Sequence, residues 1–204
     1  QPINGHIEMA ESFSGVIDKL QKDASYRKQF KKIFRTSFIS PEHVLKALAQ
    51  FTGTMTSANS KYDRYKKGTA SYSVQEENGY QLFLTHCNSC HREPLFTDYS
   101  LRNIGLPVES FLNDYGKLML TNDHSDSLKF KVPTLRNVYI SSNYMHDGRF
   151  NTLAQCINHY RTGVQQSSTL DPQLTNGIQL TDAEAINIAL FLRTLTDSTF
   201  LQDT

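Results

Sequence analysis

One run of five residues, Cys87-Asn-Ser-Cys90-His91, constrains this chain more than any other feature. Two cysteines at this spacing can each form a thioether with one vinyl group of a haem, and the following His can then coordinate the iron. A zinc site that adds His86 or His91 is one alternative, but a structural zinc site needs four ligands and no second pair follows at zinc-finger spacing. A thioredoxin-like redox pair would need a βαβ context that the sequence lacks. The motif therefore predicts covalent haem c on Cys87 and Cys90, with His91 as an axial ligand.

Composition narrows the class of protein further. The 204 residues include 21 Lys and Arg and 20 Asp and Glu, so the net charge of +1 gives no argument for a nucleic-acid or membrane-surface partner. No apolar run approaches the roughly 18 residues that would span a bilayer. The odd count of three cysteines fits a haem pair plus Cys156, which we expect to be a small buried hydrophobic residue. We expect neither a nucleic-acid partner nor a membrane span.

Three helices are predicted by the residues that cap their N-termini. Each begins with Ser or Thr at the N-cap, and an apolar stripe at helical spacing follows. The three capping residues are Ser40, Ser73 and Thr181. The second helix runs directly into the haem motif, and the third is expected to end near Thr196.

The remaining segments read as loops. Residues 52–72 are rich in Thr, Ser, Lys and Gly and are expected to form a connector. Residues 92–145 contain several Pro, Gly and Asn but keep apolar anchors. No alternating apolar pattern of useful length indicates a strand. The predicted fold class is all-α, with long ordered loops.

The ligand on the other side of the iron decides the kind of site, because a sixth ligand favours electron transfer and a vacancy favours catalysis. Met9 and Met55 precede the haem motif, whereas cytochrome c domains take this Met from a later loop. Met119 has a helical or core-packing context. Met145 lies in a polar, turn-rich segment, where a thioether has little reason to exist unless it binds something. His146 is its main rival, so the residues alone leave two candidates.

Five segments together resemble a known family. They are residues 49–65, Phe130-Lys-Val-Pro-Thr-Leu-Arg-Asn-Val138, Tyr144-Met-His-Asp-Gly-Arg-Phe150, residues 180–184 and residues 189–195. They are similar to the bacterial di-haem cytochrome c peroxidases, a family that includes the MauG-type enzymes, and they span nearly the whole chain. The resemblance implies that Met145 is the distal ligand of the C-terminal, electron-accepting haem. MauG-type enzymes carry Tyr at this position, so Met145 favours the peroxidase interpretation.

The resemblance also implies a second, peroxidatic haem in an N-terminal domain. The chain opens at Gln1 without Met and has no second Cys-x-x-Cys-His motif. We therefore expect residues 1–70 to be the remainder of that domain, with its trailing helices and a connector, and residues 71–204 to be the C-terminal cytochrome c electron-transfer domain. Glu8 resembles the acid that assists O–O cleavage, and an ordinary solvated Glu is the alternative.

Further site residues are implied by the same resemblance. A calcium ion would be held partly by backbone carbonyls near Lys131 and Pro133, helped by water. Arg136 and Arg149 would pair with haem propionates, because an Arg fork matches a carboxylate. Solvated Arg side chains are the alternative.

The predicted function is that of a cytochrome c peroxidase, an enzyme that would need the N-terminal haem domain as well. It would reduce hydrogen peroxide to water with single electrons from a small donor, such as a mono-haem cytochrome, through the His91/Met145 haem. Haem attachment takes place outside the cytoplasm, so we expect a periplasmic protein. A mono-haem electron-transfer cytochrome without catalysis and a MauG-like di-haem oxidase remain alternatives, and a homodimer stays open.

Overall fold

The computed structural model describes residue 3 and residues 9–202, and the chain divides into two compact units, Gln1–Thr56 and Ser57–Thr204. Glu8 lies outside the described residues, so its role stays a prediction. The division of the chain into a remnant of a peroxidatic domain and an electron-transfer domain likewise stays a prediction. No helix in the described part of the chain is long and apolar enough to cross a membrane.

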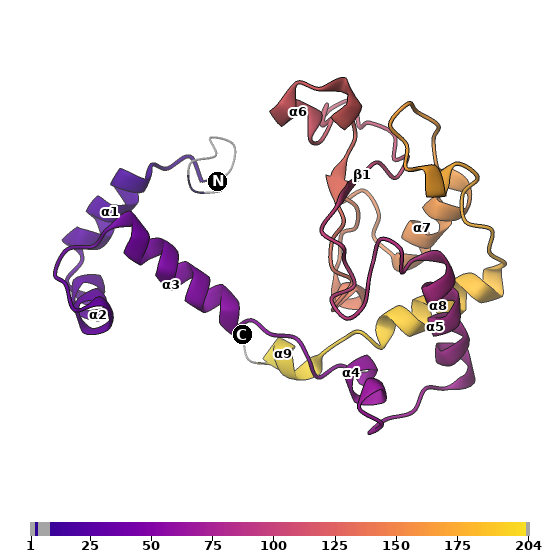
Figure 1. Cartoon of the computed structure of the whole chain (residues 1–204), viewed down its shortest axis with the longest axis horizontal. Helices are drawn as coiled ribbons and strands as arrows, with labels where there is room; N and C mark the ends of the chain where they lie inside the picture. Colours follow the sequence, from indigo (N-terminus) through magenta and orange to yellow (C-terminus); the bar gives the residue numbers. More distant parts are fainter. Residues whose placement is uncertain (1–2, 4–8, 203–204) are drawn as a thin grey trace. The chain divides into compact units, whose positions relative to one another are not determined.

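The described residues of the first unit form the helices α1 (Phe13–Lys22), α2 (Ala24–Phe34) and α3 (Pro41–Thr54) (Figure 1). The predicted helix after Ser40 is confirmed as α3: the Ser40 hydroxyl accepts from the His43 backbone N–H, and His43 Nδ1 accepts from the Ser40 N–H. The Ser12 hydroxyl at the start of α1 and the Asp23 carboxylate at the start of α2 also accept from backbone N–H groups, which satisfies donors that a helix start leaves free.

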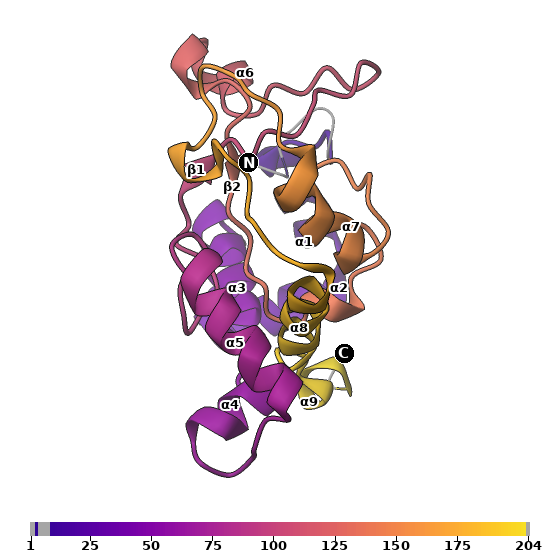
Figure 2. The ribbon, with the colours of Figure 1, turned by 90° about the vertical axis from the view of Figure 1, so that its right-hand side faces the viewer.

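The second unit is built from short helices joined by long loops, as predicted. Its helices are α4 (Lys61–Lys66), α5 (Val74–His86), α6 (Leu118–Thr121), α7 (Leu153–Asn158), α8 (Asp182–Arg193) and α9 (Ser198–Gln202). The strands β1 (Leu101–Arg102) and β2 (Phe130–Lys131) form one short antiparallel pair. Figure 2 shows α6 and the strands at one end of this unit and α4 and α9 at the other. The mostly helical fold confirms the predicted all-α class.

The core of the second unit lies where α5 packs against α8. A Cβ at Gly79 of α5 would lie 1.9 Å from the carbonyl oxygen of Asn187 in α8, so only Gly allows the two backbones to approach this closely. Phe83 and Phe191 are fully buried beside this crossing, with ring centroids 5.0 Å apart. The crossing fixes α5, and with it the haem motif at the C-terminal end of α5.

The connector prediction for residues 52–72 is only partly right, because α4 lies within it. Ser60 and Asp63 form a capping box there: Ser60 Oγ accepts from the Asp63 N–H, and an Asp63 carboxylate oxygen accepts from the Ser60 N–H. Tyr62 of α4 is buried and packs edge-on against Phe96 at 4.8 Å. This helix is short and polar apart from its tyrosines, so composition hides it.

The long loops of residues 92–145 are ordered by polar anchors. Thr97 Oγ1 donates to the Val132 carbonyl at 2.6 Å, and it joins two loop segments that lie far apart in sequence. The buried Asn103 side chain donates to Ser167 and Thr169 and accepts from the Gly105 N–H. Buried polar groups need such partners, and these anchors hold the loops around the haem motif.

Candidate haem-binding site

The haem motif continues α5 as a tight turn. Cys87 is the C-cap of α5, and its N–H donates to the Phe83 carbonyl at 2.8 Å. The N–H groups of Cys90 and His91 both donate to the Cys87 carbonyl, at 3.2 and 2.9 Å. The two thiols and the imidazole are therefore held by a helix end that is itself fixed in the core.

The His91 side chain is oriented by two backbone carbonyls. Its Nδ1 lies 3.1 Å from the Phe96 oxygen and 3.2 Å from the Pro133 oxygen. Because carbonyl oxygens only accept, Nδ1 must carry the proton, and Nε2 keeps the lone pair that can coordinate a metal. Burial lowers the pKa of His91, against the opposing effect of these hydrogen bonds, so the ring is neutral at pH 7. This is the arrangement that orients a metal-ligating His.

The cysteines of the motif are free thiols in the structure. Burial, helped by the proximity of Cys90, raises the pKa of Cys87 to about 12, and burial also raises the pKa of Cys90. Among the described residues, no three or more His, Cys, Asp or Glu side chains gather to hold a metal ion, so the zinc alternative finds no ligand set there. Two thiols one turn apart and an imidazole with a free Nε2 fit covalent haem c.

Met145 lies in a closed loop with an unusual backbone. Its φ of 69° is in the left-handed region, which is uncommon for a residue with a side chain. The loop is closed by the Tyr144 N–H, which donates to the Phe150 carbonyl at 2.8 Å, and by an ion pair between Asp147 and Arg149. Met145 itself is half-buried. The loop thus holds the thioether on a constrained backbone outside the core.

The two rivals of Met145 have other surroundings. The His146 ring stacks on Phe130, with centroids 3.6 Å apart and planes inclined by 14°. Met119 lies in helix α6, which confirms its helical context, but it is 61% exposed, so the alternative of core packing is wrong. These contacts favour Met145, whose ligation of the iron stays a prediction.

Both predicted propionate partners are paired with carboxylates of the chain itself. Arg136 donates to the two Asp63 oxygens, each at 3.0 Å, and to the Pro94 carbonyl. Arg149 pairs with Asp147 and donates to the Pro107 carbonyl at 2.8 Å. Asp63 was missed from the sequence, although its capping-box spacing after Ser60 was a readable signal. The propionate roles stay predictions.

One of the two residues of the predicted calcium site, Pro133, contacts the haem motif. The Pro133 carbonyl accepts from His91 Nδ1 at 3.2 Å, and the Lys131 amine lies 5.2 Å above the Tyr99 ring. Calcium binding by these carbonyls stays a prediction. A cluster of charged side chains that no sequence pattern predicts is centred on Arg102, which forms ion pairs with Asp98 and Asp171.

The fold and the motif define a c-type cytochrome domain, and the comparisons agree. The cytochrome c family matches residues 76–196, and the family described as di-haem cytochrome c peroxidase matches residues 1–71. The chain belongs to the cytochrome c family, in the group that comprises the di-haem cytochrome c peroxidases and MauG proteins. Haem c is the cofactor of this family, and the described residues at Cys87, Cys90 and His91 suit it.

Two curated relatives illustrate the match. The methylamine utilization protein MauG of Paracoccus denitrificans is 30% identical over 97% of this chain, and the cytochrome c551 peroxidase of Nitrosomonas europaea is 32% identical over 76%. The chain spans 64% and 48% of the length of these relatives.

Solved structures share the fold. A MauG-like protein associated with microbial copper homeostasis superposes with a TM-score of 0.81, at 26% identity, over 95% of this chain and 65% of its own. The diheme peroxidase BthA of Burkholderia thailandensis superposes with a TM-score of 0.75, at 22% identity, over 98% of this chain and 63% of its own. The second likeness supports the fold alone.

Proposed function

We propose that this chain carries the electron-entry haem of a cytochrome c peroxidase. The observation that carries the proposal is the His91 imidazole at the end of the Cys87–His91 motif, which two backbone carbonyls hold with Nε2 free, and Met145 in its closed loop is the proposed second ligand. A His/Met pair gives a haem a high potential, which suits a site that receives electrons from a donor. The named relatives include cytochrome c peroxidases and the matched family is described by that activity, which supports the same assignment.

The residues of this chain would hold and orient the cofactor. Cys87 and Cys90 would carry the two thioethers, His91 Nε2 would coordinate the iron, and Met145 Sδ would complete the coordination. The bound haem supplies one-electron redox chemistry. The Phe96 and Pro133 carbonyls keep the proton on His91 Nδ1, and the packed rings beside α5 keep water from that side. In the complete reaction, hydrogen peroxide, two electrons and two protons give two molecules of water at a second haem.

A haem count with a turnover assay tests this function. We expect the native full-length gene product to contain two haems per chain and to oxidise a reduced mono-haem cytochrome when peroxide is added. One haem per chain without peroxide turnover would instead assign a mono-haem electron-transfer cytochrome. The assay should be run with the periplasmic fraction as the source, since periplasmic location and a cytochrome donor form part of the proposal.

A MauG-like oxidase is the second candidate, because MauG proteins are among the relatives at 30% identity. Such an enzyme would oxidise a residue of a protein substrate and would not turn over peroxide with a cytochrome donor. Met145 argues against it, since MauG-type enzymes resemble this chain but carry Tyr at that position. Absence of steady-state peroxide turnover, with two haems present, would favour this candidate.

A further inference from the structure

A charged triad lies in the loops beside the haem motif and has no part in the function described so far. Arg102 donates to an Asp98 oxygen at 2.8 Å and to an Asp171 oxygen at 2.6 Å. The three side chains are only 23%, 14% and 9% exposed, in the order Arg102, Asp98 and Asp171. Its net charge is −1, and Arg102 is the one cation between two carboxylates.

The triad is physically joined to the haem motif. Ser89, inside the motif, donates from Oγ to Gln173 Oε1 at 2.6 Å. Gln173 belongs to the short turn Pro172–Leu174, whose first N–H groups are capped by Asp171, with the Gln173 N–H donating to Asp171 Oδ1 at 3.0 Å. Arg102 therefore holds the turn Pro172–Leu174, and this turn contacts Ser89, one of the two residues between the haem cysteines.

The charges of the triad act on the haem-binding side chains. Arg102, Asp98 and Asp171 all interact electrostatically with the Cys90 thiol, and Arg102 and Asp98 also with His91. The pKa of Arg102 lies above its ordinary range because both carboxylates stabilise its charged form. The cation is thus permanent at any pH at which the protein is folded.

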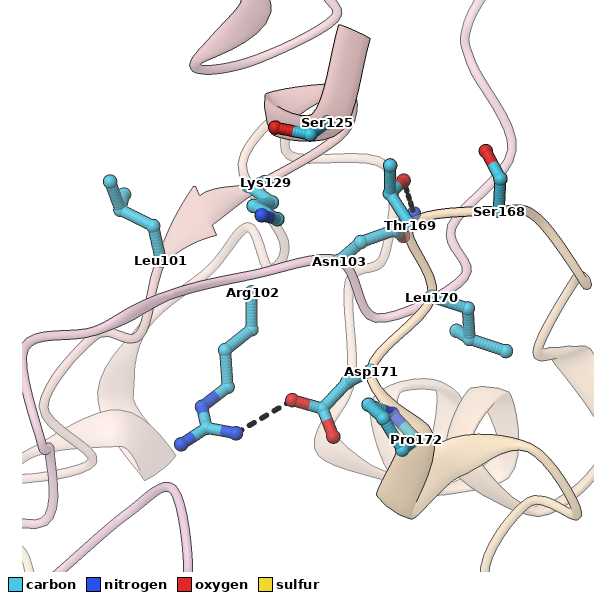
Figure 3. A pocket seen from close by; sticks show the side chains of 10 residues that line it. All are labelled: Leu101, Arg102, Asn103, Ser125, Lys129, Ser168, Thr169, Leu170, Asp171 and Pro172. Atoms are coloured by element: carbon cyan, nitrogen blue, oxygen red, sulfur yellow. Dashed lines mark hydrogen bonds and ion pairs between the residues drawn. The ribbon is translucent and has the colours of Figure 1, made fainter. Parts of the chain in front are cut away.

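A pocket of about 310 Å³ opens on one side of the triad (Figure 3). Arg102, Asp171, Asn103 and Thr169 are among its lining residues, and the close-up shows the Arg102 fork directed at Asp171. The pocket is open to solvent, so water that enters it would screen the charges of the triad. We therefore expect the triad to change the reduction potential of the haem by much less than a fully buried charge would.

We propose that Arg102 is a positioning residue that raises the reduction potential of the haem on Cys87 and Cys90, by keeping a fixed positive charge beside the attachment motif between Asp98 and Asp171. A nearby cation disfavours the ferric state, which carries one more positive charge than the ferrous state. The inference requires a haem on this motif and holds whether or not the protein reduces peroxide.

Redox titration of the haem-loaded protein tests the proposal. Arg102→Gln should lower the midpoint potential of the haem. At a given solution potential the ratio of ferric to ferrous haem should rise roughly tenfold, which corresponds to about 59 mV for one electron. Asp171→Asn should raise the potential, since it removes a negative charge from the same place. Arg102→Lys keeps the charge and loses the fork, so it should restore most of the potential.

Lys61→Gln is the matched control. Lys61 pairs with Glu76 at 2.6 Å, and Glu76 lies in the first turn of α5, roughly 15 Å along the helix from His86. Removal of this cation should leave the potential unchanged. The variants are compared at equal haem content, after each shows the weak near-infrared absorption band that Met ligation gives to an oxidised haem.

Three outcomes would overturn the proposal. The first is an unchanged midpoint potential in haem-loaded Arg102→Gln. The second is an equal shift of the potential in Arg102→Gln and Arg102→Lys, which would show that the role of Arg102 is purely structural. The third is a shift of the same sign in Arg102→Gln and Asp171→Asn. If Arg102→Gln does not fold, the nearly isosteric Asp171→Asn replaces it as the test: a higher midpoint potential supports the proposal, and an unchanged or lower one contradicts it. A protein without peroxide turnover would contradict the proposed function and leave this test intact.

Discussion

The two sides of the proposed haem site are built by opposite means. The helical side, residues 73–96, presents His91 from the end of α5, which is capped, packed and crossed at Gly79 by α8. The loop side, residues 138–150, presents Met145 from a turn with a left-handed φ, closed by Tyr144 and the Asp147–Arg149 pair. A helix end is fixed by many repeated contacts, whereas a loop depends on a few specific ones. The comparison teaches that the core holds the first proposed ligand in place, whereas individual hydrogen bonds and one ion pair hold the second.

The largest expected effect is on the helical side. Cys87→Ala combined with Cys90→Ala removes both thioether donors, so we expect complete loss of covalent haem, measured by haem staining after denaturing electrophoresis. Cys156→Ala is the control and should retain the haem. Covalent haem in the double variant would place the attachment elsewhere in the chain.

On the loop side, Met145→Ala should abolish the weak near-infrared band that sulfur ligation gives to an oxidised haem. His146→Ala should keep this band, because its ring is stacked on Phe130 and is not the proposed ligand. A band that survives in Met145→Ala and disappears in Met119→Ala would assign the ligand to α6 instead.

The two proposed ligands also show how much of the site can be predicted from the sequence. The motif at Cys87–His91 and the caps at Ser40, Ser73 and Thr181 are local signals, and each was confirmed as a helix start or a helix end. The orientation of His91 depends on the Pro133 carbonyl, 42 residues away, which no local pattern specifies.

The loop side shows the limit more clearly. The local sequence leaves both Met145 and His146 as candidate ligands, and only the family resemblance favours Met145. The contacts that separate them, such as the His146 ring on Phe130, are formed by the tertiary fold. Helix α4 and the partners of Arg136 are also hard to predict from the sequence, because a short helix and a long-range ion pair leave little periodic pattern.

The helical side should be intolerant of added volume at its crossing point. Gly79→Ala places a methyl group on the Asn187 carbonyl, so α5 and α8 must separate, and we expect a loss of about 3 kcal/mol in the free energy of unfolding. Asn78→Ala, at the exposed neighbouring position, should change it by no more than about 0.5 kcal/mol. Urea titration followed by circular dichroism measures both, and equal stabilities would show that the helices do not meet there.

A smaller effect is expected at Asp197, which ties residues 57–59 to the end of α8. This side chain is 1% exposed and accepts from Ser57, Asn59 and Thr199. Burial alone would raise its pKa, but these hydrogen bonds lower it to about 2. Because the pKa of Asp197 is lower in the folded chain than in the unfolded chain, its carboxylate stabilises the fold at any pH above the unfolded-state pKa of about 4. This stabilisation is lost as the pH falls from about 4 to about 2.

Asp197→Asn tests this pH dependence. We expect it to cost about 2 kcal/mol at pH 7 and to flatten the acid limb of the stability curve. Urea midpoints measured from pH 7 to pH 2 give the answer. A variant as acid-sensitive as the wild type would assign the acid transition to other carboxylates.

The smallest effect should come from a single loop-side hydrogen bond. Tyr144 Oη donates to the Val138 carbonyl at 3.1 Å, and Tyr144→Phe removes this bond while keeping the buried ring. We expect a loss of about 1 kcal/mol and an earlier thermal loss of the near-infrared band than of the helical signal. Simultaneous loss of both signals would mean that the loop side is as firmly held as the helical side.

The crossing at Gly79 has a consequence for the order of events in the making of the protein. Helix α5 ends at His86, whereas its packing partner α8 begins only at Asp182, so the helix end that carries the thiols can form before the two helices pack. In the folded chain the Cys87 thiol is partly buried and its pKa is raised to about 12, which makes it a poor nucleophile. Before α8 docks, the same thiol is open to a haem vinyl group. Attachment is therefore favoured while the chain is still immature, and closure of the crossing ends the period in which the cofactor can be added.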